Sequence, residues 1–212
     1  MTVCVYAIAS DGHVPVVGGV RLRAVGAGRV WAIVAPARRA PVPSPALLRR
    51  HHRIVAALAD TAAAVLPARF GTIMDEEELK VVLRARRPAM VSALRHVRGQ
   101  VQMTLRLLDQ DDPPVVTGVR GTTRQSGAAY LRERAAASGS RRIPGFGSVR
   151  DALDRWVRDE RVERAQRVVS VYHLIPRRAA PAYLRAATTA IAGTGLRVAL
   201  SGPFPPYAFT SW

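Results

Sequence analysis

Apolar residues recur along this chain with two different periods. Segments with the two-residue period of a strand alternate with segments that have the three- to four-residue period of a helix. Val3 to Ala9 alternates as a strand does, and Arg29 to Ala35 is a second apolar run that ends at Pro36. We expect these two strands to pair. From Ser44, which can cap a helix, apolar residues recur at three and four positions until near Val65. This succession predicts an α+β fold better than a doubly wound sheet.

A second helix has a clear beginning in the sequence. Asp75 can act as its N-cap, and the glutamates at 76–78 fill the first turn, where the helix dipole favours negative charge. Capping therefore explains these carboxylates without acid catalysis or a magnesium site. We expect this helix to kink or break at Pro88 and to end at Gly99, before a strand over Val101 to Leu108.

The polar, proline-ended stretch from Asp109 to Pro114 is the best linker in the sequence. It predicts two small α+β domains, residues 1–110 and residues 111–212. At least one of them is expected to be ferredoxin-like, the second being rich in helix and closed by a proline and aromatic tail. The expected elements of the second domain are a helix over Ser126 to Ala137, a helix with a capping box at Ser148 and Asp151, a strand over Val168 to Ile175, a helix over Ala182 to Ala192, and a strand over Leu196 to Leu200.

The chain carries a formal net charge of +17, and such a field attracts polyanions. Only one of its 32 basic residues, Lys80, is a lysine. The arginines run from Arg21 to Arg197 without a dominant cluster, which favours solvated arginine faces over a specific nucleic-acid site. A basic protein associated with nucleic acid remains the alternative function.

The sequence contains no motif that would justify proposing an enzyme. Gly26-Ala27-Gly28 precedes a strand, and the P-loop lysine is missing, so a nucleotide site is rejected. His51 and His52 point about 100° apart on a helix and cannot easily share one metal ion. We expect no cofactor, no metal and no small-molecule substrate.

The expected compartment is the cytoplasm. The first ten residues lack the basic region of an export signal, and the apolar stretches are too short to span a bilayer. The lone Cys4 is expected in the core as a reduced thiol.

The end of the chain concentrates proline and aromatic residues. Prolines hold this segment extended and remove hydrogen-bond donors, while the rings supply apolar surface. A strap packed over the fold is the favoured interpretation, and an exposed hook that binds a partner is the alternative. The residues that the hook hypothesis assigns to partner binding are Pro203, Phe204, Pro205, Pro206, Tyr207 and Phe209.

Four separated motifs, in order, resemble those of the gas vesicle synthesis family GvpF/GvpL. The tail GPFPPYAF, beginning at Gly202, resembles the family's GPWPPYSF ending, and the opening strand with Tyr6 resembles its VYGI-like start. Phe204 replaces the usual tryptophan, and Gln102 stands where the family often has glutamate. The remaining motif positions are Pro67, Arg69, Phe70 and Gly71 in LPARFGT, and Gly127, Tyr130 and Leu131 in SGAAYL.

The resemblance implies a role in gas vesicle formation, as a non-catalytic assembly factor or a minor structural protein. It implies binding to the gas vesicle shell protein and to other gas vesicle accessory proteins. The shell protein exposes an apolar face, so a partner that covers this face before assembly would prevent aggregation. The tail and a sheet edge of the first domain are the candidate contact surfaces.

Overall fold

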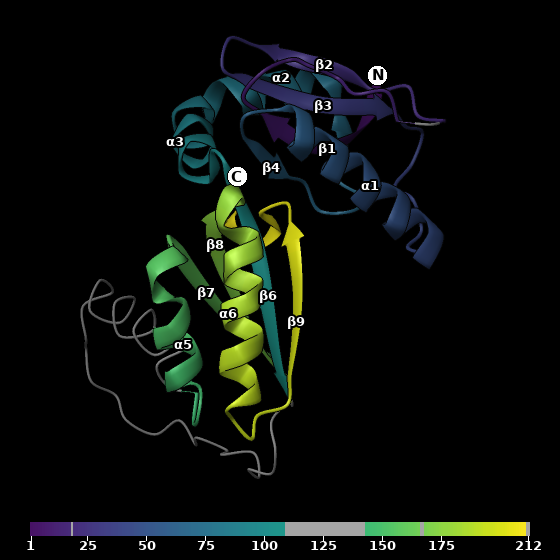
Figure 1. Ribbon diagram of the computed structural model, residues 1–212. Coiled ribbons are helices and arrows are strands. Elements are labelled where there is room, and N and C mark those ends of the chain that lie inside the picture. Colours follow the sequence, from purple (N-terminus) through teal and green to yellow (C-terminus); the bar gives the residue numbers. More distant parts are fainter. Residues whose placement is uncertain (18, 109–142, 166–167, 211–212) are drawn as a thin grey trace, which may run out of the picture. The chain divides into compact units, whose positions relative to one another are not determined.

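The computed structural model describes residues 1–17, 19–108, 143–165 and 168–210 (Figure 1). The chain divides into two compact units, one made of Met1–Gln102 with Pro203–Trp212 and the other of Met103–Gly202. Each unit contains a β-sheet with helices packed on it. The predicted boundary between residues 110 and 111 falls outside the described ranges and stays a prediction.

The first sheet is antiparallel and follows the order β2-β3-β1-β4, with β5 also paired to β1. The predicted pairing of the first two apolar runs is confirmed, because β1 and β3 pair with Cys4 opposite Ala35. Cys4 is buried, which confirms its expected place in the core. The strands are β1 (Thr2–Ala9), β2 (Arg23–Ala27), β3 (Val30–Pro36), β4 (Val65–Pro67) and β5 (Ile73–Asp75).

Helix α1 (Pro45–Thr61) begins as predicted, because the Ser44 side chain accepts a hydrogen bond from the backbone N–H of Leu47. The prediction that it continues to near Val65 is wrong. The backbone is already extended at Ala62, and Val65 opens β4, where it pairs with Ala9 of β1. Sheet pairing therefore overrides the apolar periodicity at this end of the helix.

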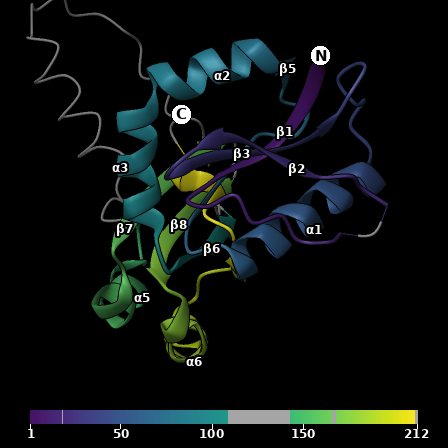
Figure 2. The same cartoon turned by 90° about the horizontal axis from the view of Figure 1, so that it is seen from above.

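The core of the first unit lies between α1 and the sheet. Ile54 and Leu58 of α1 are fully buried in one cluster with Ala7 and Ala9 of β1 and Ile33 of β3. Burying a large aliphatic side chain of this kind stabilises a fold by about 1.5–3 kcal/mol. Figure 2 shows β1, β2 and β3 between α1 on one side and α2 and α3 on the other.

The predicted second helix is two helices, α2 (Glu76–Ala85) and α3 (Arg87–Val97). Asp75 caps α2 by accepting from the N–H of Glu77 at 2.9 Å, as its sequence predicts. The break at Arg86, with Pro88 in the first turn of α3, confirms the expected interruption. Figure 2 shows the change of direction between the two helices.

The second sheet follows the order β7-β8-β6-β9, and α5 and α6 lie side by side on it (Figure 1). Buried Val149 and Leu153 anchor α5, and buried Tyr183 and Ala187 anchor α6. The remaining elements of the chain are β6 (Gln100–Leu108), α5 (Gly147–Leu153), η2 (Asp154–Trp156), β7 (Asp159–Ala165), β8 (Val168–Pro176), η3 (Arg177–Ala179), α6 (Ala180–Ala192), β9 (Val198–Phe204) and η4 (Tyr207–Phe209).

The structure of the second half differs from the prediction at the start of α5 and at β7. The capping box at Ser148 and Asp151 is wrong, because the N-cap of α5 is Phe146, two residues earlier, and it makes no side-chain cap hydrogen bond. Strand β7 was not expected, because most of its residues are charged or exposed. The predicted helix over 126–137 lies outside the described residues.

Candidate functional site

A cleft opens in the first unit where β1, the loop after β3, α1 and the turn after β4 meet. We call it the first-unit cleft, and its volume is about 240 Å³. The side chains that shape it are Cys4 and Tyr6 of β1, Arg39 of the loop, Arg50 and His51 of α1, and Phe70 of the turn. Two of the six, Tyr6 and Phe70, are among the motif positions singled out in the sequence.

Tyr6 reaches this cleft because β1 is irregular at that position. The register between β1 and β3 shifts between Val5 and Ala7, which leaves Tyr6 as an extra residue in the ladder. Such bulges turn a side chain away from its regular direction. The backbone carbonyl of Tyr6 accepts a hydrogen bond from the N–H of Ala68, beyond the end of β4.

A tight turn from Arg69 to Thr72 places Phe70 on the opposite wall. The N–H and the hydroxyl of Thr72 both donate to the carbonyl of Arg69, at 3.2 and 2.8 Å. Gly71 has a φ of +79°, a left-handed conformation that side chains with a Cβ rarely adopt. The glycine of the motif is therefore explained by the turn, and Arg69 is left exposed.

His51 lies between the two rings and is 7% exposed. Tyr6 stacks on it at 5.3 Å between ring centroids, and Phe70 meets it edge-on at 5.7 Å. Its Nε2 lies 3.2 Å from the carbonyl of Ala68. Because a carbonyl only accepts, Nε2 carries the proton and Nδ1 is left as the acceptor of the neutral ring.

The floor of the cleft is electrically neutral. Burial lowers the pKa of His51, so its ring is uncharged at neutral pH. Burial likewise raises the pKa of the Cys4 thiol and of the Tyr6 phenol. Positive charge is confined to the rim, where Arg39 and Arg50 are exposed.

The described part of the tail packs on the same unit as α1. The hydroxyl of Tyr207 is hydrogen-bonded to Nδ1 of His52 at 3.1 Å, and Phe204 meets the His52 ring edge-on at 5.8 Å. The side chain of Gln102 accepts from the N–H of Ala208 at 2.7 Å. This packing is the arrangement expected of a strap, and partner binding by the tail stays a prediction.

The other predicted site residues fall into three groups. Pro205, Pro206 and Phe209 are buried, Pro203 is exposed, and Gly202 has a left-handed φ within β9. Pro67 is buried in β4. Gly127, Tyr130 and Leu131 lie outside the described residues.

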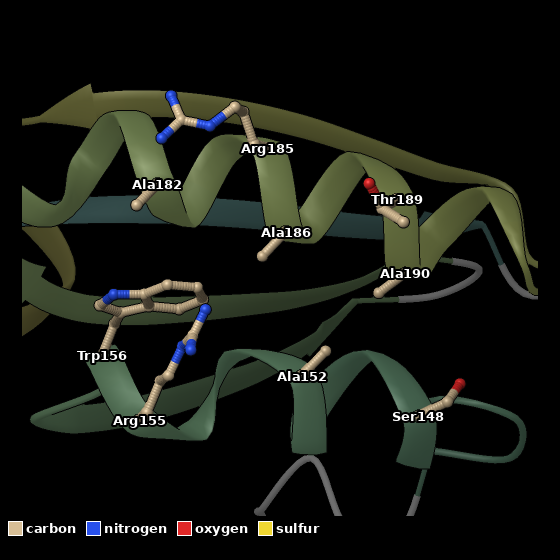
Figure 3. Close-up of a pocket in the computed structure, with 9 residues that line it drawn as sticks. All are labelled: Ser148, Ala152, Arg155, Trp156, Ala182, Arg185, Ala186, Thr189 and Ala190. Carbon is tan, nitrogen blue, oxygen red and sulfur yellow. The ribbon is translucent and has the colours of Figure 1, made fainter.

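The second unit has a groove of about 640 Å³ between α5 and α6 (Figure 3). Ala182, Ala186 and Ala190 point from α6 toward the wall formed by α5 and η2. In η2 the guanidinium of Arg155 lies 3.9 Å from the centroid of the Trp156 ring. Short alanine side chains account for the width of the groove. The sequence did not indicate it, because its two walls come from separate helices.

A chain of three hydrogen-bonded side chains crosses the core of the second unit. His173 is 1% exposed, with Nδ1 at 2.7 Å from the Tyr183 hydroxyl and Nε2 at 3.1 Å from a Glu160 carboxylate oxygen. Burial raises the pKa of Tyr183 far above its ordinary value. Tyr183 is fully buried, and the chain of groups links β7, β8 and α6.

The described part of the chain bears on two further kinds of site, for metal ions and for membranes. No group of three or more His, Cys, Asp or Glu side chains there is arranged to hold a metal ion. No helix in those same residues is long and apolar enough to cross a membrane.

Comparison with known proteins identifies the family. Residues 3–211 match the family model of the gas vesicle synthesis proteins GvpL/GvpF. A comparison with curated proteins finds no match. The fold is similar to the crystal structure of gas vesicle protein GvpF from Microcystis aeruginosa, with a TM-score of 0.72 and 13% identity over 98% of each chain. It is also similar to that of GvpF from Anabaena sp. PCC7120, with a TM-score of 0.73 and 13% identity over 100% of this chain and 96% of the other. Because the family model spans nearly the whole sequence, the chain belongs to the GvpL/GvpF family of gas vesicle synthesis proteins.

Proposed function

We propose that this chain acts in gas vesicle formation as a non-catalytic assembly factor or minor structural protein. It binds the gas vesicle shell protein and other accessory proteins, and works at the growing vesicle. The observation that carries the proposal is the family match over residues 3–211. The absence of a catalytic role is part of the proposal, and the burial of His173 and Tyr183 supports it.

Two surfaces of the first unit support binding of an apolar partner. Strand β2 ends the order of its sheet, so one of its edges has no partner strand among the described residues, and such an edge can pair with a strand of another protein. In the tail, Phe204 and Tyr207 are only half-buried and adjoin exposed Pro203. A soluble protein that offers such surface can shield the apolar face of a shell subunit before it joins the vesicle.

The order of elements in the second unit supports the ferredoxin-like fold that the sequence analysis expects of at least one domain. Its described elements occur as strand, helix, two strands, helix and strand, and the sheet order is β7-β8-β6-β9. We infer that this unit is ferredoxin-like, because this succession and order are those of the split βαβ arrangement.

Co-precipitation with the purified shell protein tests the function directly. We expect the full chain to retain the shell protein, and the Phe204→Ala, Tyr207→Ala double variant to retain less of it. Tyr172→Ala is the matched control, because Tyr172 is a partly exposed aromatic residue of β8 in the other unit. Circular dichroism checks that each variant is folded. Failure of the unaltered chain to bind the shell protein or any other gas vesicle protein would contradict the proposal.

Binding to nucleic acid is the alternative that the charge of +17 raises. It predicts retention of duplex DNA at physiological ionic strength and a steep loss of binding with added salt. The same preparation can be tested against DNA and shell protein, so the two functions are separated in one experiment.

A further inference from the structure

We propose that the first-unit cleft binds an acidic segment of a partner protein, which inserts an aromatic side chain beside a carboxylate. This inference deepens the proposed function and rests on it, since it names the chemistry of one partner contact. The tail and the β2 edge are surfaces separate from this cleft, since none of their residues lines it.

The floor of the cleft is suited to a ring. Tyr6, His51 and Phe70 already form a stacked pair with a third ring edge-on, at centroid distances of 5.3 and 5.7 Å. Aromatic side chains prefer these two geometries with one another, and a further ring can extend the cluster. At about 240 Å³ the cleft can take one such side chain and is too small for a helix.

Hydrogen bonding inside the cleft also favours a peptide. Nε2 of His51 is committed to the carbonyl of Ala68, which leaves Nδ1 as an acceptor on the buried ring. A peptide N–H is a donor that matches it. A bare carboxylate at neutral pH has no proton to offer to this atom.

The rim supplies the complementary charge. Arg39 and Arg50 line the cleft, and the guanidinium of Arg50 also donates to the carbonyl of Gly19 at 3.3 Å, which positions it. The sequence from Gly12 to Ala59 contains eight arginines and no aspartate or glutamate. A carboxylate that approaches this rim therefore meets positive charge without a competing acid from the same segment.

A small test ligand for the cleft therefore needs an aromatic ring with a peptide N–H, and a carboxylate. N-acetyl-phenylalanine carries a phenyl ring, a peptide N–H and a carboxylate, and its amide keeps the ring and the peptide N–H but has an uncharged carboxamide in place of the carboxylate. Titration of each into the isotopically labelled full chain, followed by two-dimensional NMR, reports both affinity and location. We expect the acid to shift the signals of Tyr6, His51 and Phe70, and the amide to bind about fivefold more weakly, as loss of a partly exposed charge contact implies.

Variants of the rim separate the cleft from general attraction to a basic protein. Arg39→Gln with Arg50→Gln should weaken binding of the acid about fivefold or more and leave binding of the amide unchanged. Arg49→Gln is the matched control, because Arg49 is an exposed neighbour of Arg50 that does not line the cleft. It should leave both affinities as they are. Phe70→Leu should weaken both probes, because it removes the ring contact.

Three outcomes would overturn the inference. Equal binding of acid and amide would remove the role of the rim, and shifts confined to residues outside the cleft would remove the site. Competition by inorganic phosphate as strong as by the acid would show that charge alone is recognised.

A vesicle-formation assay distinguishes this inference from the proposed function. If the double arginine variant loses the probe yet supports normal vesicles, while deletion of the gene abolishes them, the cleft is not the partner site and the proposed function stands. If deletion has no effect on vesicles, the proposed function fails whatever the cleft binds.

Discussion

The side-chain oxygen of Gln102 accepts a hydrogen bond from the backbone N–H of Ala208 at 2.7 Å. The two residues are far apart in sequence, one in β6 and the other in the 3₁₀ turn η4 (Tyr207–Phe209). Gln102 is 4% exposed, so the bond lies where water competes poorly. It fixes the tail to the first unit at one defined point.

Replacing Gln102 by methionine should therefore loosen the tail. Methionine keeps the length of the side chain and removes the acceptor, so the Ala208 N–H loses its partner. The expected loss in the free energy of unfolding is about 1 kcal/mol, as for one hydrogen bond. Urea denaturation measures the loss, and faster hydrogen exchange at the Ala208 amide locates it.

Gln100, two residues earlier on the same strand, provides the matched control. Its side-chain oxygen is buried and has no hydrogen-bond partner among the described residues. Gln100→Met should be close to neutral, because removing a buried acceptor without a partner offsets the loss of the long, exposed bond of 3.4 Å from Nε2 to the Arg98 carbonyl. Equal losses in the two variants would show that the bond to Ala208 contributes nothing to stability.

Tyr207 should make the tail sensitive to alkaline pH. Burial raises the pKa of Tyr207 to about 12. An acid whose pKa is raised by folding contributes stability that is complete below the pKa of the unfolded chain, about 10. That contribution is lost as the pH rises through the folded value.

The variant Tyr207→Phe tests this pH dependence. At neutral pH it should lose about 1 kcal/mol, because the hydrogen bond to His52 is gone while the ring remains. Between about pH 10 and 12 the variant should lose less stability than the unaltered protein, because phenylalanine has no proton to release. Parallel curves for the two proteins over this range would contradict the burial of the hydroxyl.

Elements could be predicted where the sequence supplies their local chemistry. Ser44 and Asp75 cap the helices that follow them, and Pro88 marks the break between α2 and α3. The local sequence predicts the wrong element where pairing with a neighbouring strand decides the structure. Ala62 to Val65 continues an apolar helical pattern, yet β1 draws Val65 into the sheet. Strand β7 has an almost wholly charged sequence and forms because β8 pairs with it along its length.

The candidate site could be predicted only in part. Tyr6, Phe70 and Gly71 were singled out by their resemblance to family motifs, but His51 was considered only as a metal ligand or a packing residue. Its role follows from a bulge in β1 and a turn after β4, which bring two rings to one helix face. The pattern within any one segment cannot show that these three rings contact one another, because the walls of the cleft come from four separate parts of the chain.

The buried chain of Tyr183, His173 and Glu160 should contribute to stability as a unit. Tyr183→Phe leaves Nδ1 of His173 without its partner, in a residue that is 1% exposed, so we expect a loss of about 1–3 kcal/mol. His173→Leu should cost a similar amount. The double variant should lose less than the sum, because neither polar group is then left buried without the other. Chemical denaturation of the four proteins measures the coupling, and strict additivity would show that the two groups do not interact.

The pair of Arg23 in β2 and Glu76 at the start of α2 should stabilise the first unit above acidic pH. The two side chains meet through two hydrogen bonds, one of them Nη1 to Oε1 at 3.0 Å. The Arg23 guanidinium, with a smaller effect from Lys80, holds the pKa of Glu76 below its ordinary value. A lowered carboxyl pKa contributes stability that is complete above the unfolded pKa, about 4.3, and lost as the pH falls through the folded value.

Comparison with Glu76→Gln reveals this contribution. The unaltered protein should be more stable than the variant at pH 6–8 by an amount that stays constant, and the difference should shrink below about pH 4.5. Glu78→Gln is the charge control, since it removes an exposed carboxylate from the same helical turn. Because the first turn of α2 favours any negative charge, Glu78→Gln measures that general effect, and only the excess seen at Glu76 belongs to its contacts with Arg23 and Lys80. Equal effects of the two variants at every pH would mean that the helix dipole, and not the bond to β2, accounts for the glutamate at position 76.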